Sequence, residues 1–192
     1  MDKLILASRN KNKIEEMKEL VAHLGIEVFS ALDFPDLEEV EEDKPTLEGN
    51  ALKKARYVNK QTGIPALSDD TGLEVEALDG APGVYSARYA GEDATYQDNV
   101  LKLLAALQEK PNRKAQFRTV VALVDGDKEY TFEGVCKGSI IEGQQGSKGF
   151  GYDPIFMPED FAETFAQMDA SIKNLISHRG KAVQKFVEFL ED

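Results

Sequence analysis

Residues 4–13 read Leu-Ile-Leu-Ala-Ser-Arg-Asn-Lys-Asn-Lys, and this stretch sets the fold class. Its first four residues form a short apolar run bounded by polar residues, which is typical of a buried strand. Ser8 and Asn10 then stand where a helix N-cap is expected. One apolar helix face follows at spacings of three and four: Ile14, Met17, Leu20, Val21 and Leu24. The stretch therefore predicts a strand that passes directly into a helix ending near Gly25.

The same alternation continues along the chain. Strands are predicted at residues 26–29, 65–68, 73–77, 115–124 and 129–140, and helices at residues 46–61, 94–108 and 181–190. Asp69-Asp70-Thr71-Gly72 reads as a glycine turn after a strand, and Asp125-Gly126-Asp127 as a hairpin turn. Strands that alternate with helices first, and pair with each other later, predict an α/β domain with a mixed sheet and flanking helices.

Length and charge exclude several classes of protein. The chain has 192 residues and a net charge of −12, which fits one domain over residues 1–192 and argues against broad adhesion to nucleic acid or to an anionic membrane. No apolar run approaches the roughly 20 residues that a membrane helix needs. The single cysteine, Cys136, fits a reducing compartment, so we expect a cytoplasmic location.

The polar residues after the first strand suggest an anion site. A helix N-terminus offers unpaired N–H groups and partial positive charge, and Asn10 and Lys13 are close enough to face one phosphate group. No Walker loop is present. The alternative is a capped helix with solvated lysines.

Carboxylates are concentrated in the acidic loop 33–43 and in Asp69-Asp70. Mg²⁺ prefers oxygen ligands, often one or two carboxylates with waters and substrate phosphates. Adjacent residues of a strand point to different sides, so we expect one aspartate at most to bind a metal directly. The alternative for the acidic loop is a solvated surface.

Two further motifs combine glycine, aromatic and basic residues. In Gly149–Pro154 the glycines permit close backbone approach, and Phe150 offers a ring face to a base. In Ser171–Gly180, Lys173, His178 and Arg179 supply donors and positive charge. The alternative for the first motif is a turn that places two aromatic rings in the core.

Six blocks in order carry a resemblance over about residues 4–190. They are Ser-x-Asn-x-x-Lys, Glu-x-Asn-Ala, Ser-Asp-Asp-Thr-Gly-Leu, Gly-Ala-Pro-Gly-Val-Tyr-Ser-Ala-Arg-Tyr, Gly-Phe-Gly-Tyr-Asp-Pro and Ser-His-Arg-Gly. Together they resemble the inosine triphosphate pyrophosphatase family. The resemblance implies an elongated mixed β-sheet with two lobes around a central cleft, a homodimer, and Mg²⁺-dependent hydrolysis of ITP, dITP and XTP to the monophosphate and pyrophosphate. It thus implies removal of deaminated purines from the nucleotide pool.

The resemblance also implies roles for residues at matching positions. Asp70 would be the general base and a metal ligand, and Glu41 its metal partner, with the adjacent Glu42 as the other candidate. The phosphates would be held by Ser8, Asn10 and Lys13, with Lys54 nearby, and the other substrate-binding candidates of this stretch are Arg9, Lys11 and Asn12. Thr71 would contact the substrate, and the base would be surrounded by Phe150, Gly151, Tyr152, Asp153, Lys173, His178 and Arg179. A candidate dimer surface includes Leu78, Val84, Tyr85 and the loop around Arg88.

Two other functions remain open. A Maf-like house-cleaning pyrophosphatase would cleave UTP or dTTP, or modified nucleotides, in preference to ITP. A nucleotide-binding module without turnover would release no pyrophosphate from ITP. Asp69-Asp70 with Lys13 argues against the module, because binding alone needs no carboxylate that activates water.

Overall fold

The structure is a computed structural model that describes residues 1–191. Its strands are β1 (Lys3–Leu6), β2 (Glu27–Ser30), β3 (Ala66–Val75), β4 (Pro82–Gly83), β5 (Lys114–Asp125), β6 (Lys128–Ile140) and β7 (Phe156–Pro158). Its α-helices are α1 (Lys11–Val21), α2 (Leu47–Thr62), α3 (Tyr96–Ala106), α4 (Ala170–Ile176) and α5 (His178–Glu191). None of the helices within residues 1–191 is long and apolar enough to cross a membrane.

The strands form one sheet in the order β2-β1-β3-β5-β6-β7, with β4 paired to β3. β1 is parallel to β2 and to β3, whereas β4 is antiparallel to β3 and β7 is antiparallel to β6. The predicted α/β fold with a mixed sheet and flanking helices is therefore confirmed.

The chain divides into two compact units. The first comprises Met1–Asp70, Thr119–Gly134 and the chain from Arg179 onward, and the second comprises Thr71–Arg118 and Val135–His178. β3, β5 and β6 each contribute residues to both units.

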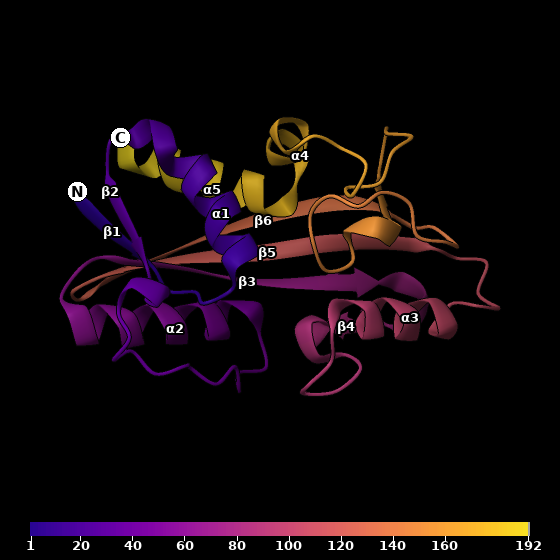
Figure 1. The fold of residues 1–192 in the computed structure, drawn as a ribbon, viewed down its shortest axis with the longest axis horizontal. Coiled ribbons are helices and arrows are strands. Elements are labelled where there is room, and N and C mark those ends of the chain that lie inside the picture. Colours follow the sequence, from indigo (N-terminus) through magenta and orange to yellow (C-terminus); the bar gives the residue numbers. More distant parts are fainter. Residues whose placement is uncertain (192) are drawn as a thin grey trace. The chain divides into compact units, whose positions relative to one another are not determined.

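Helices cover both faces of the sheet in the first unit. α1 and α5 lie side by side on one face (Figure 1), where Met17 of α1 and Phe186 of α5 pack with Leu6, Leu67 and other apolar side chains of the strands. α2 covers the opposite face, and its main-chain carbonyl at Ala51 accepts a hydrogen bond of 2.5 Å from the Ser68 hydroxyl of β3. Because successive residues of a strand point to opposite faces, Leu67 and Ser68 contact different helices.

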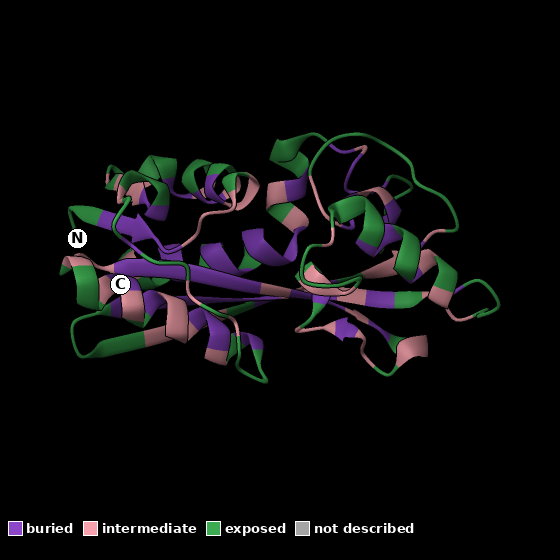
Figure 2. Cartoon of the chain, turned by 60° about the horizontal axis from the view of Figure 1, so that its bottom comes forward, coloured by how far each residue is buried: buried purple, intermediate pink, exposed green. Residues whose placement is uncertain are grey.

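The second unit has its own core. Leu73 and Val75 of β3 pack with α3 and with aromatic residues that include Phe117, Phe156 and Phe165. In Figure 2 the long central strands are buried along much of their length, and the outward turns of the helices are exposed. Gly72 permits the close approach of β4, since a Cβ atom on Gly72 would lie 2.6 Å from the Gly83 carbonyl oxygen.

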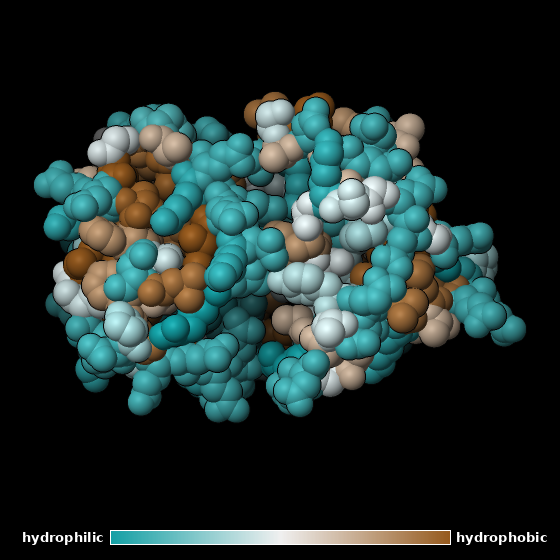
Figure 3. Space-filling view, viewed as in Figure 1, coloured by the Kyte–Doolittle hydropathy of each residue, from teal (hydrophilic) through white to brown (hydrophobic). Residues whose placement is uncertain are grey.

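Helix starts agree with the cap residues in the sequence. The Asn10 side chain caps α1 by accepting hydrogen bonds from the backbone N–H groups of Asn12 and Lys13 at 3.1 and 3.3 Å. The Thr46 hydroxyl accepts from Gly49 at 3.0 Å and caps α2. α4 was not predicted, because it has only seven residues and its apolar side chains Ile172 and Leu175 are exposed. These side chains account for apolar atoms over α4 in Figure 3.

Candidate active site

The aspartate pair lies within β3 and not in a turn after it. The prediction of a strand ending at Ser68 was wrong, because β3 runs without interruption from Ala66 to Val75. Leu73 and Val75 are fully buried, while Glu74 between them is partly exposed, as the predicted alternation implies. Asp69 and Asp70 are both buried, and as consecutive strand residues they point to opposite faces.

Asp69 faces α1 and α5 and belongs to an ion-pair cluster. Its Oδ2 atom accepts from Nε and Nη2 of Arg179 at 3.2 and 3.1 Å and lies 3.2 Å from Nζ of Lys13. Arg179 also donates through Nη1 to Oε2 of Glu16 at 2.5 Å. Burial alone would raise the pKa of the Asp69 carboxyl, but Lys13 and Arg179 hold it well below its usual range. Asp69 is therefore ionised at every working pH.

Asp70 has the opposite electrostatic environment. Burial raises the pKa of its carboxyl to about 6; the charge of Lys54 opposes this shift, and the charge of Glu42 adds to it. Nζ of Lys54 donates to Oε1 of Glu42 and to the Asp69 carbonyl oxygen, both at 2.6 Å. Burial would lower the pKa of Lys54, but the charges of Glu42, Asp70 and Asp69 raise it, so Lys54 stays protonated.

Glu41 and Glu42, the two candidates for the metal partner of Asp70, differ in their surroundings. The side chain of Glu41 is exposed, and its carbonyl oxygen accepts from Nζ of Lys53 at 2.7 Å. Glu42 is partly buried beside Lys54, and its charge acts on Asp70. These positions favour Glu42 over Glu41 as the metal partner of Asp70, and metal binding by either residue stays a prediction.

The donor set of Glu42 and Asp70 fits a hard divalent cation. Two carboxylates suit Mg²⁺, which takes oxygen ligands and keeps several waters or substrate oxygens. Within residues 1–191 no group of three or more His, Cys, Asp or Glu side chains is arranged to hold a metal. Two carboxylates leave the remaining coordination positions of such a cation to waters or substrate oxygens.

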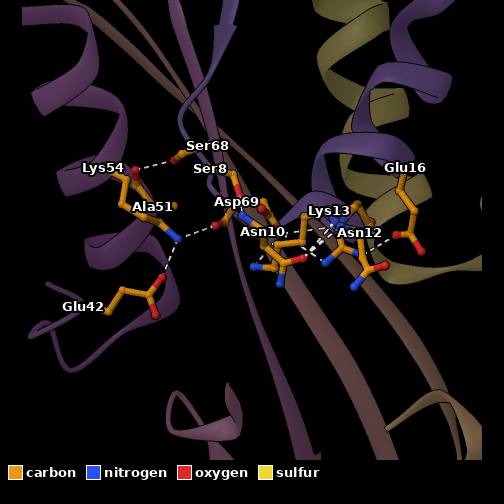
Figure 4. A network of polar contacts seen from close by, with 11 residues as sticks. Ser8, Asn10, Asn12, Lys13, Glu16, Glu42, Ala51, Lys54, Ser68 and Asp69 are labelled. Atoms are coloured by element: carbon orange, nitrogen blue, oxygen red, sulfur yellow. Dashed lines mark hydrogen bonds and ion pairs between the residues drawn. The ribbon is translucent and has the colours of Figure 1, made fainter. Parts of the chain in front are cut away.

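The predicted anion site surrounds the start of α1. Figure 4 shows Asn10 and Lys13 on one side of Asp69, with Lys54 and Glu42 on the other. The Ser8 hydroxyl accepts a hydrogen bond from the Asn10 N–H at 3.2 Å, and the side-chain oxygen of Asn10 caps the helix. The sequence left open whether Ser8 or Asn10 caps α1, and the cap is Asn10.

The other residues of this motif differ in position. The Arg9 guanidinium donates to the Leu37 carbonyl and so ties the acidic loop to the start of α1. The Lys11 side chain is exposed, whereas Asn12 is partly buried within the first turn of α1. Thr71 is the first residue of the second unit and is partly buried.

In the second unit, the base-site residues are linked to each other. Nζ of Lys173 donates to Oδ2 of Asp153 at 2.7 Å, and both side chains are buried. The same carboxylate oxygen accepts from the Phe150 N–H at 3.1 Å, and Nζ of Lys173 lies 5.3 Å from the centroid of the Phe150 ring. Phe150 is partly exposed, whereas Lys173 and Asp153 are buried, so Phe150 is the accessible residue of this cluster.

The side chain of Tyr152, a predicted base-site residue, points into the core. It is buried in the core of the second unit, and its hydroxyl donates to the Ser86 carbonyl at 2.7 Å. Burial raises the pKa of this hydroxyl above its usual range. The alternative interpretation, an aromatic ring placed in the core by a glycine turn, describes the Tyr152 side chain, and contact of Tyr152 with a base stays a prediction.

His178 and Arg179 are the first two residues of α5. The sequence pattern had placed them before this helix. The His178 ring stacks on Phe117 with centroids 4.4 Å apart, and it is buried in the second unit. Arg179 belongs to the first unit, where two carboxylates engage it. Its contact with a base stays a prediction.

Two contributors to these clusters were missed. Glu16 stands three residues after Lys13 on α1, a spacing that places both side chains on one helix face and was available in the sequence. Asn50 belongs to the Glu-x-Asn-Ala block but was given no role; it is fully buried and contacts the backbone of Lys44.

The fold and these contacts define an α/β protein with a buried site of mixed charge, built from carboxylates, lysines and the start of a helix. The chain belongs to the Ham1 family, whose family model matches residues 4–189. It is 50% identical over 188 residues to a Flavobacterium johnsoniae protein named dITP/XTP pyrophosphatase, covering 98% of this chain and 97% of that relative. The resemblance inferred from the six sequence blocks is thus confirmed.

Two solved structures are similar over almost the whole chain. A HAM1 protein from Coxiella burnetii is 41% identical with a TM-score of 0.90, covering 100% of this chain and 99% of that one. The Staphylococcus aureus Ham1 protein is 38% identical with a TM-score of 0.88, covering 98% of each chain. The fold described above is therefore that of Ham1 proteins.

Proposed function

We propose that this chain is a Mg²⁺-dependent pyrophosphatase that hydrolyses ITP, dITP and XTP to the monophosphate and pyrophosphate. The relative from Flavobacterium johnsoniae carries the name dITP/XTP pyrophosphatase. The observation that carries the proposal is that the pKa values of two adjacent carboxyl groups are shifted in opposite directions. Asp69 is held ionised by Lys13 and Arg179, whereas Asp70 has a pKa of about 6. Carboxylates whose pKa values are pushed apart take different roles in catalysis.

The proposed chemistry follows from these environments. Asp70 and Glu42 would hold the cation, and Lys13, Lys54 and the N–H groups at the start of α1 would hold the triphosphate. Bound Mg²⁺ would offset the phosphate charge that repels a nucleophile. Water attacks the α-phosphorus, the bond to the bridging oxygen breaks, and pyrophosphate leaves. Asp70 accepts the proton from the water, because a base with a pKa near the working pH is effective.

The base would be read by groups of the second unit. Hypoxanthine and xanthine present a carbonyl at C6, where adenine presents an amino group. Donors such as His178 or backbone N–H groups near Gly151 would satisfy the carbonyl and oppose the amino group. A buried donor left unpaired is unfavourable by about 1–3 kcal/mol, so two mismatches give tens- to thousands-fold discrimination. The Phe150 ring, beside Lys173, would stack on the base.

A panel of triphosphates tests the function directly. Pyrophosphate release would be measured from ITP, dITP, XTP, ATP, GTP, UTP and dTTP, each with Mg²⁺ and with EDTA. We expect rapid release from the first three only, and only with Mg²⁺. Preference for UTP or dTTP would instead identify a Maf-like enzyme, and binding of ITP without release would identify a nucleotide-binding module.

The ionisation of Asp70 predicts the acid limb of the pH profile. Its carboxyl must be ionised to accept a proton or bind a cation, so we expect kcat/KM for ITP to fall as the pH drops below about 6. Raising the Mg²⁺ concentration should move this limb to lower pH, because cation binding favours the ionised form. If the acid limb does not move with the Mg²⁺ concentration, it reports the ionisation of a group other than Asp70.

Lys13 is expected to bind phosphate and not the nucleoside. We expect Lys13→Ala to weaken ITP binding by about 10- to 100-fold, the range for hydrogen bonds to charged groups, and to leave inosine binding nearly unchanged. Binding would be measured by calorimetry. Lys18→Ala, which removes an exposed lysine of the same helix, is the control. If Lys13→Ala weakened the binding of ITP and of inosine equally, the assignment of Lys13 to phosphate binding would be contradicted.

We also propose a homodimer, a cytoplasmic location and no nucleic-acid or membrane partner. Support for a dimer surface comes from the loop after β4, where Tyr85 is 58% exposed and the Arg88 guanidinium lies 5.2 Å from the centroid of its ring. The oligomeric state by sedimentation, compared between the unaltered chain and Tyr85→Ser, tests this surface.

A further inference from the structure

The start of α2 holds the acidic segment 41–44 in place. Asn50 is fully buried, and its side chain makes two hydrogen bonds with the backbone of Lys44. Its Oδ1 accepts from the Lys44 N–H at 2.9 Å, and its Nδ2 donates to the Lys44 carbonyl at 3.4 Å. Asn50 thus fixes a backbone position two residues beyond Glu42.

Two lysines of the next turn contact the same segment. Nζ of Lys53 donates to the Glu41 carbonyl at 2.7 Å and to Oδ1 of Asp43 at 2.8 Å, and Lys54 donates to Glu42. Residues three and four positions after Asn50 lie on the same helix face, so three side chains of α2 reach consecutive residues of the segment. Gly49 permits this approach, since a Cβ atom there would lie 2.9 Å from Cβ of Lys44.

The segment needs such an anchor. Residues 34–46 contain no helix or strand, and the carboxylates of Glu41, Glu42 and Asp43 follow one another and repel. The pair of Lys53 with Asp43 is solvent-exposed and contributes little. The buried amide of Asn50 is shielded from water, so it is the stronger of these two fixed points.

We propose that Asn50 is a positioning residue that holds Glu42 in place for cation binding. The inference rests on the metal site of the proposed function, and it adds a residue that contacts neither the cation nor the substrate. It acts through the Lys44 backbone, as outer groups around metal sites orient the ligands themselves.

Binding of Mn²⁺ alone, followed by electron paramagnetic resonance, tests the proposal without turnover. We expect Asn50→Ala to weaken Mn²⁺ binding about 10-fold or more, the effect typical of losing an outer partner of a metal ligand. Asn59→Ala is the matched control, because Asn59 lies on the same helix and donates to the Ile64 carbonyl. It should leave Mn²⁺ binding unchanged.

A double-mutant cycle shows whether Asn50 acts through Glu42. In a Glu42→Gln background, adding Asn50→Ala should change Mn²⁺ binding by less than about twofold, because the coupled partner is already gone. Equal effects of Asn50→Ala in both backgrounds would overturn the proposal, as would unaltered Mn²⁺ binding in the single variant or no Mn²⁺ binding by the unaltered chain.

Amide hydrogen exchange supplies a second readout. In metal-free Asn50→Ala, the Lys44 amide should exchange faster, because it loses its acceptor, while amides of β1 keep their protection. Faster exchange throughout β1 would overturn the proposal by showing general destabilisation. If the Mn²⁺ cycle holds but the unaltered chain does not hydrolyse ITP, the positioning role stands and the proposed function fails.

Discussion

Asp70→Asn is expected to lower kcat for ITP by about 100- to 10,000-fold, the range for losing a general base, and to weaken the cation site as well. The asparagine side chain keeps the size of the carboxyl but can neither accept the proton nor carry its charge. Pyrophosphate release at saturating ITP and Mg²⁺ measures the effect. Asp36→Asn, which alters an exposed carboxylate, is the control and should keep full activity. Near-normal turnover in Asp70→Asn would remove Asp70 from the base role.

The same variant should be more stable than the unaltered chain in metal-free buffer. The pKa of Asp70 is raised from 3.8 to about 6 in the folded chain, so ionised Asp70 opposes folding. This destabilisation is absent below pH 4, grows as the pH rises towards 6, and is complete above it, at up to about 3 kcal/mol. Urea unfolding of both proteins at pH 4 and at pH 7.5 should therefore differ only at the higher pH. A gain in stability with a loss of activity would separate catalysis from folding.

Arg179→Met is expected to destabilise the fold by about 3–5 kcal/mol at pH 7, because it leaves buried charge without its partner. Arg179 contacts Asp69 and Glu16 and is 3% exposed. Urea unfolding measures the loss. Arg56→Met is the matched control: Arg56 makes two 2.7 Å hydrogen bonds to Glu129, but this pair is exposed and should contribute about 1 kcal/mol or less.

The stability lost in Arg179→Met should change with pH in a defined direction. The pKa of Asp69 is lowered in the folded chain, so its ion pairs stabilise the fold above its ordinary pKa of 3.8 and lose this effect as the pH falls through the lower folded value. Arg179→Met should therefore lose most stability at neutral pH and less in strong acid. Equal losses for the Arg179 and Arg56 variants would contradict a buried ion-pair role.

The local parts of the fold were predictable from the sequence. The strand into α1 and the helix from residue 47 carry their own cap residues and apolar periods. The continuity of β3 was not predictable, because Asp-Asp-Thr-Gly has the composition of a turn. Distant partners keep it extended: β3 lies between β1 and β5 in the sheet, Lys13 and Arg179 engage the first aspartate, and Gly83 approaches the glycine closely.

The candidate site, like the fold, was predictable in part. The lysines and carboxylates were predicted by motif, but their partners come from distant segments. Arg179 is 110 residues from Asp69, and Tyr152 donates to a carbonyl 66 residues away. A pattern of neighbours in sequence does not specify such pairs, which is why the burial of Tyr152 and the contact of Arg179 with Glu16 appeared only in three dimensions.

The alternation of Asp69 and Asp70 across β3 makes the reading frame of this strand a condition for activity. Deleting one residue between Pro65 and Ser68 would turn each carboxylate towards the helix that now faces its neighbour. One deletion would thus place the Asp69 carboxyl, which stays ionised, and the Asp70 carboxyl, which titrates, in each other's surroundings. Point substitutions in β3 can therefore be graded in effect, whereas length changes are expected to abolish folding and catalysis together.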